Sequence, residues 1–134
     1  MKFDNKYFSQ HDFPKAQIEK NLGNAIKDLN IAKKDNILDV KFNYAYSALL
    51  KTGLTLLSQQ QIKIKSAPGH HIKIIEAMAE LLKDDSIADV GNAMRSKRNI
   101  DMYSGGIEVT KKECEEYIDF VDKIVVQVKA FLAF

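Results

Sequence analysis

A cluster of polar side chains lies in residues 94–106, where an apolar helical pattern ends at two glycines. The cluster contains Arg95, Lys97 and Arg98, followed by Asn99 and Tyr103. Two arginines three residues apart share one face of a helix and can reach the same ligand. Because the planar guanidinium group makes bidentate contacts with phosphate, the pattern predicts a phosphate-binding site. We expect Asn99 to orient a base or a phosphate and Tyr103 to donate a hydrogen bond or to stack on a base.

A purely structural interpretation of the same residues stays open. Cations near the C-terminal end of a helix interact favourably with its dipole, and the ring of Tyr103 can serve in packing. Tyr103 is a poor candidate for a general base, because an unperturbed phenol has a pKa of about 10.

A second polar segment begins with Gly69, His70 and His71. Adjacent side chains point about 100° apart on a helix, so these two histidines are unsuited to holding one metal ion. With no His-x3-His pair and one cysteine in the chain, we predict no metal site and no cofactor. We expect one histidine to cap the helix or to bond to a neighbouring helix, and the other to be exposed. Both can titrate near neutral pH, so a catalytic role for either stays open.

Helical spacing of apolar residues recurs through most of the chain and predicts the elements that position these side chains. We expect helices over residues 14–33, 37–60, 70–83, 86–104 and from residue 110 onwards. Thr110 and Glu113 have the spacing of a capping box. Gly53, inside the second helix, predicts the close approach of a neighbouring helix. The fold class we predict is all-α, an antiparallel up-and-down bundle of four to five helices.

Two stretches show no helical period. We expect residues 1–12 to form an arm that either packs over the bundle or frays. Residues 59–69 predict a loop with two lysines, because the alternation over residues 62–65 is too short to predict a strand.

Composition limits the class of protein. A length of 134 residues predicts one domain, residues 1–134, and 46% hydrophobic with 28% charged residues is typical of a globular chain. No apolar run is long enough to span a membrane. The formal net charge is +2, so contact with a nucleic acid would be local rather than spread over the surface.

The first residues and the single cysteine indicate where the protein works. Residues 1–6 lack the apolar core of a secretion signal, and one cysteine fits a reducing compartment. We therefore predict a cytoplasmic protein. Cys114 falls on an apolar helical stripe, which favours a buried small hydrophobic residue over a nucleophile.

The order of these motifs resembles the HEPN superfamily of small helical prokaryotic domains. An aromatic- and alanine-rich helix over residues 42–50 leads through a short loop to the Gly-His-His helix. The pattern Arg95-x-x-Arg98-Asn99-x-x-x-Tyr103 follows, and a long capped helix comes last. The resemblance covers residues 13–131.

The resemblance implies a helical bundle that forms a homodimer, with two copies of the arginine motif facing one cleft. Many such domains are RNases, several are toxins of toxin–antitoxin or phage-defence systems, and others pair with a separately encoded minimal nucleotidyltransferase. Nuclease members resemble Arg-polar-x3-His. Arg98 and Asn99 match the first two positions, but Tyr103 stands where the histidine is expected. With a tyrosine at this position, the chain is more similar to the members that bind a nucleotide or a partner without cleaving RNA.

We therefore predict a nucleotide- or RNA-binding module, non-catalytic or weakly catalytic, with a nucleotidyltransferase as its partner protein. Arg95, Arg98, Asn99 and Tyr103 are the expected binding residues. One alternative is a metal-independent RNase toxin with a composite site at the dimer cleft, with Arg98, Tyr103, His70 and His71 as catalytic candidates. The other is a dimeric helical bundle with a structural role.

Overall fold

The computed structural model describes the backbone of residues 3–104 and 108–132, and the side chains of residues 3–99 and 108–132. The elements along the described chain are β1 (Phe8–Gln10), α1 (Lys15–Lys34), α2 (Leu38–Gln59), β2 (Ile62–Ile64), α3 (His70–Leu81), α4 (Ser86–Ser104) and α5 (Lys111–Leu132). The prediction of an all-α helical bundle is confirmed. Within the described residues, no helix combines the length and the apolar character that crossing a membrane requires.

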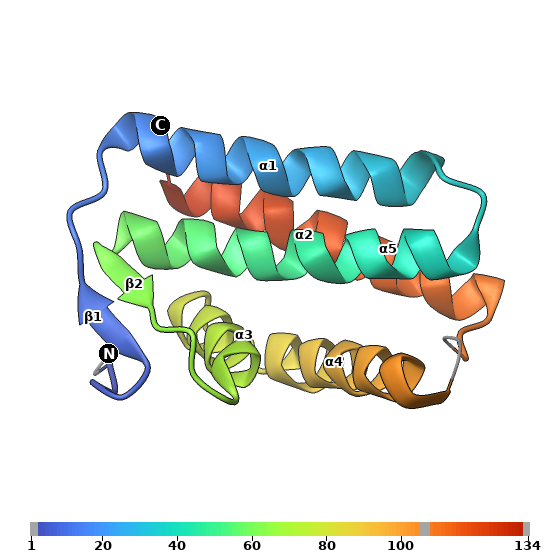
Figure 1. Cartoon of the computed structure of the whole chain (residues 1–134). Helices are drawn as coiled ribbons and strands as arrows, with labels where there is room; N and C mark the ends of the chain where they lie inside the picture. Colours follow the sequence, from blue (N-terminus) through green and yellow to red (C-terminus); the bar gives the residue numbers. More distant parts are fainter. Residues whose placement is uncertain (1–2, 105–107, 133–134) are drawn as a thin grey trace.

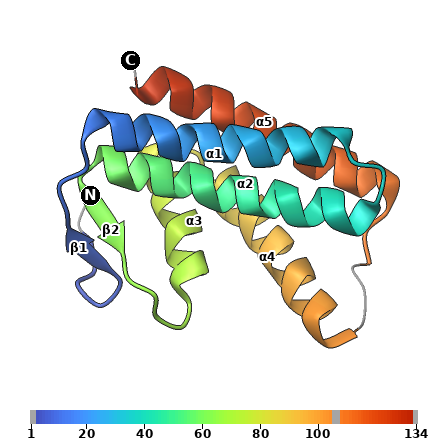
Figure 2. The ribbon, with the colours of Figure 1, turned by 45° about the horizontal axis from the view of Figure 1, so that its top comes forward.

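Helix α2 lies at the centre of the bundle and contacts all four other helices. Helices α1 and α5 lie along one side of it, and α3 and α4 pack on the side away from α1 (Figure 1). Figure 2 shows that α3 and α4 run obliquely to the layer of α1, α2 and α5. A helix surrounded in this way must be apolar on most faces, and α2 carries the large buried side chains of Phe42, Tyr46, Leu49, Leu56 and Leu57.

The predicted helix ends agree with the structure to within two residues. The capping box at the start of α5 is confirmed in both directions. The backbone N–H of Thr110 donates to Glu113 Oε1 at 3.1 Å, and the N–H of Glu113 donates to Thr110 Oγ1 at 3.0 Å. These bonds satisfy amides at the start of α5 that have no partner within the helix.

The close approach predicted at Gly53 is confirmed between α2 and α3. A Cβ atom at Gly53 would lie 2.5 Å from Ile74 Cγ2 and 3.1 Å from the Sδ and Cε atoms of Met78. Both neighbours are buried, so they have little room to move. A methyl group at this position would therefore force the side chain of Ile74 to shift.

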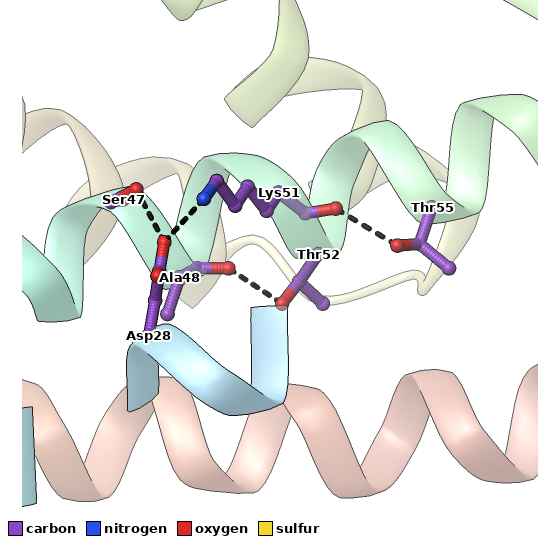
Figure 3. Close-up of polar contacts among 6 residues, drawn as sticks. All are labelled: Asp28, Ser47, Ala48, Lys51, Thr52 and Thr55. Atoms are coloured by element: carbon purple, nitrogen blue, oxygen red, sulfur yellow. Dashed lines mark hydrogen bonds and ion pairs between the residues drawn. The ribbon is translucent and has the colours of Figure 1, made fainter. Parts of the chain in front are cut away.

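A polar cluster around the buried carboxylate of Asp28 joins α1 to α2 (Figure 3). Asp28 of α1 is 5% exposed. Its Oδ2 atom accepts a hydrogen bond of 2.7 Å from Ser47 Oγ and lies 2.7 Å from Lys51 Nζ. Two buried threonines of α2 donate back to their own helix, Thr52 to the carbonyl of Ala48 and Thr55 to that of Lys51. A buried carboxylate needs such partners, so the cluster fixes how α1 faces α2.

The prediction of a loop over residues 59–69 is wrong for Ile62–Ile64, which form a strand. This strand pairs antiparallel with β1, with Phe8 opposite Ile64 and Gln10 opposite Ile62. The described part of the arm, residues 3–12, is therefore held on the bundle by this pairing. Phe8 is 6% exposed and belongs to the core, so its burial stabilises a pairing that neither short segment can form alone.

Candidate functional site

Helix α4 carries both arginines of the chain on one half-buried face. The Nε atom of Arg95 lies 3.5 Å from Asn92 Oδ1, one turn earlier. The guanidinium carbon of Arg98 lies 5.6 Å from the centre of the Tyr46 ring on α2, which is a cation–π contact. Among the side chains that the structure describes, neither arginine forms an ion pair with a carboxylate.

The first turn of α3 faces the same region. Gly69 precedes the helix with φ of +84°, a left-handed conformation that favours glycine. The backbone N–H and the Nδ1 atom of His70 both donate to the carbonyl of Ala67, each at 3.0 Å. The backbone N–H groups of His71 and Ile72 have no acceptor within the described chain. Free amides at a helix N-terminus are suited to binding an anion.

These two segments, which lie far apart in the sequence, line one pocket of about 420 Å³. The described residues that line it are Ser66, Ala67, Pro68, Gly69, His70, His71, Ile72, Arg95, Arg98 and Asn99. They include both arginines and two of the three histidines of the chain, and no carboxylate is among them. The pocket thus has a positive character that the nearly neutral chain lacks as a whole.

The prediction that one histidine caps its helix or bonds to a neighbouring helix is confirmed by His71, whereas the prediction that the other histidine is exposed is wrong. Both rings are half-buried and make an edge-to-face contact at 4.5 Å between centroids. His70 binds the turn before its own helix. His71 bonds to the neighbouring helix, since its Nδ1 atom lies 3.1 Å from the hydroxyl oxygen of Tyr46.

Tyr46 is the residue of the site that sequence reasoning missed. It lies one turn after Phe42 on the core stripe of α2 and is 1% exposed, so its pattern is that of a packing residue. The one available signal was that a phenol at a fully buried position needs a hydrogen-bond partner. His71 supplies that partner from α3.

Burial and the arginines together control the ionisation of this pair. Burial raises the pKa of Tyr46 to about 12, although Arg98 and Arg95 oppose the rise. Burial also lowers the pKa of His71, and the charges of His70, Arg98 and Arg95 lower it further. At neutral pH the phenol therefore keeps its proton and the His71 imidazole is uncharged.

The other predicted residues differ in where they lie relative to the pocket. Lys97 points away from the pocket, toward the start of α5, where its Nζ lies 3.3 Å from Glu113 and donates to the carbonyl of Glu108 at 3.1 Å. Asn99 lines the pocket and is exposed. Tyr103 falls in the last turn of α4, and its side chain lies outside the described residues.

Cys114 is fully buried in the core, as predicted. Burial raises the pKa of its thiol, which disfavours the reactive thiolate. In the described parts of the chain, no three His, Cys, Asp or Glu side chains are placed to hold a metal ion.

Comparisons with models of protein families, with curated proteins and with solved structures found no match to this chain. The resemblance to the HEPN superfamily therefore stays a prediction.

Proposed function

We propose that the pocket between α3 and α4 binds a phosphate group of a nucleotide or of RNA, as a HEPN-like module would. One observation carries this proposal. Both arginines of the chain line one pocket together with His71 and Ile72, whose backbone amides have no acceptor in the described chain, and the described residues of that pocket include no carboxylate.

The chemistry of the lining supports a phosphate over other anions. The forked guanidinium groups of Arg95 and Arg98 match the oxygen atoms of a phosphate in pairs. The helix N-terminus adds backbone donors and a partial positive charge. The exposed amide of Asn99, at the edge of the pocket, can bind a base or a sugar beside that phosphate.

The test is binding of fluorescein-labelled single-stranded RNA and of a panel of nucleotides to the full chain. We expect Arg98→Ala to weaken binding about tenfold or more, since a hydrogen bond to a charged group contributes about 1.5–3 kcal/mol. The matched control is Lys129→Ala, which removes one positive charge from α5, outside the pocket. Equal affinity of both variants would remove the assigned site, and so would binding that does not weaken with added salt.

RNA cleavage is the second candidate, and the lowered pKa of His71 is the observation that favours it. An uncharged imidazole can accept a proton from a 2′-hydroxyl group when the ring nitrogen that faces the RNA carries no hydrogen. Incubation with total RNA tests this function, with Arg98→Ala beside the wild type. Cleavage that depends on Arg98 would support it, whereas cleavage that survives in Arg98→Ala would come from elsewhere.

The homodimer, the nucleotidyltransferase partner and the role in toxin–antitoxin or defence systems rest on the resemblance alone. They stay predictions. A dimer in which the two pockets share one cleft would double the positive charge available to an RNA strand.

A further inference from the structure

The contact between Tyr46 and His71 connects the centre of the bundle to the pocket. The side chain of Tyr46 is 1% exposed, so its hydroxyl group has almost no access to bulk water. The phenol oxygen lies 3.1 Å from Nδ1 of His71, and His71 lines the pocket. The hydrogen between them belongs either to the Tyr46 oxygen or to His71 Nδ1. Its position decides whether the other ring nitrogen of His71, Nε2, is a hydrogen-bond donor or an acceptor toward a ligand.

The hydroxyl group has one acceptor available within the described chain, and that acceptor is Nδ1 of His71. If Nδ1 carried a hydrogen, it would donate to the phenol oxygen, and the buried O–H would be left without an acceptor. Buried donors without partners are rare because they are costly. The arrangement therefore favours Tyr46 as the donor and Nδ1 as the acceptor. The hydrogen of an uncharged imidazole then lies on Nε2.

We propose that Tyr46 is a positioning residue that holds His71 as the Nε2–H tautomer, so that His71 donates a hydrogen bond to the ligand's phosphate. The donor role rests on the proposed function, whereas the tautomer does not. An Nε2–H group has no lone pair with which to accept a proton. The same arrangement thus favours binding of RNA over its cleavage by His71.

The surroundings of His71 keep it in this state. The groups that face it are Tyr46 from α2, His70 from its own helix, and Arg95 and Arg98 from α4. Protonation of His71 would place a hydrogen on Nδ1, which would then donate to the Tyr46 oxygen. The O–H group of Tyr46 would be left without an acceptor. The two arginines oppose the added charge as well.

The tautomer is measured by two-bond hydrogen–nitrogen correlation spectra of the full chain with 15N-labelled histidine. We expect Nε2 of His71 to carry the hydrogen in the wild type. Tyr46→Phe removes the hydroxyl, keeps the ring, and should convert His71 to a mixture of tautomers. Tyr44→Phe, an exposed tyrosine two residues away on α2, is the matched control and should leave the spectrum unchanged. A wild-type His71 with hydrogen on Nδ1 would overturn the proposal, as would a tautomer that Tyr46→Phe does not change.

The donor role is measured by the affinity for fluorescein-labelled single-stranded RNA. We expect His71→Ala, which removes the donor, to weaken binding about fivefold, the effect of one hydrogen bond. Tyr46→Phe should weaken binding about twofold if it leaves an equal mixture of tautomers, because the affinity falls with the fraction of molecules that carry the Nε2–H group. His71→Ala also keeps the test valid if Tyr46→Phe fails to fold.

The two proposals fail in different ways. If the wild type has the Nε2–H tautomer but binds neither RNA nor nucleotides, the proposed function and the donor role both fail and the positioning by Tyr46 stands. If the wild type binds through Arg98 but His71→Ala binds equally well, the donor role alone is wrong. Faster RNA cleavage by the wild type than by His71→Gln would instead identify His71 as a base and overturn the donor role.

Discussion

At the scale of single residues, the pocket depends on side chains whose neighbours change their usual chemistry. Arg98 lies over the ring of Tyr46, and Tyr46 lies against His71, so three residues from three helices constrain one another. Lys97, next to Arg98 in the sequence, is instead engaged with Glu113 at the start of α5. Arg98 thus lines the pocket, whereas the adjacent Lys97 joins α4 to α5.

The lowered pKa of His71 predicts a pH dependence of stability. Its pKa in the folded protein lies below the ordinary value of 6.5, so the unfolded chain binds more protons as the pH falls through that range. The contribution of His71 to stability is therefore fully present above about pH 6.5 and is lost at lower pH. We expect the free energy of unfolding to fall between pH 7.5 and pH 5.5 in urea titrations. The fall should be smaller in His71→Gln, and an equal fall in both proteins would contradict the assignment.

At the scale of elements, the packing of neighbouring helices and the capping of helix ends stabilise the bundle. Helix α5 illustrates how neighbours set the buried face. It packs against both α2 and α1, so its buried face is broader than a single heptad seam. Ile118, Val125 and Leu132 lie on that face, whereas the neighbouring Phe131 is 39% exposed.

Two glycine substitutions should change stability in opposite directions. Gly53→Ala places a methyl group against Ile74 and Met78, and such overpacking costs about 1–3 kcal/mol. Better helix propensity returns about 1 kcal/mol, so we expect a net loss of up to about 2 kcal/mol. Gly23→Ala on α1 meets nothing within 4 Å and should gain about 0.5–1 kcal/mol. Urea denaturation measures both, and a stabilised Gly53→Ala would refute the close contact.

Loss of the capping box should weaken α5 from its first turn. Thr110→Ala removes the hydroxyl that accepts from the Glu113 amide, and we expect a loss of about 1 kcal/mol in the free energy of unfolding. Lys112→Ala, an exposed change in the same turn, is the matched control and should alter stability by less than about 0.5 kcal/mol. Equal effects of the two changes would show that the cap contributes nothing measurable.

At the scale of the whole molecule, the pocket forms where α3, α4 and the loop before α3 meet around the central helix α2. A ligand that binds there contacts segments that are separate in the unfolded chain. Binding to the folded state alone must then raise the stability of the entire fold.

We expect a nucleotide or RNA present at 100 times its Kd to add about 2.7 kcal/mol to the free energy of unfolding. Denaturation with and without the ligand measures this gain. Arg98→Ala at the same ligand concentration should show a clearly smaller gain, because its Kd is larger. A gain that is the same in both proteins would mean that the ligand binds outside this pocket.

Local sequence determined the helices and their ends. The apolar period, the capping box of Thr110 with Glu113, and Gly53 each act over a few residues or mark one position, so they could be recognised without knowledge of distant segments. Local sequence also located the arginines and the histidines that line the pocket. The strand pair could not be predicted, because residues 8–10 and 62–64 stabilise each other across more than fifty positions.

The tertiary structure alone decided which of these residues meet. Tyr46 and His71 are 25 positions apart, and no periodicity relates them. The packing of α3 and α4 on α2 brings the histidines to Arg95 and Arg98 and sends Lys97 elsewhere. The physical reason is that period and capping depend on near neighbours in the chain. Hydrogen-bond pairing, burial and pKa depend on neighbours in space, which exist only once the helices have packed.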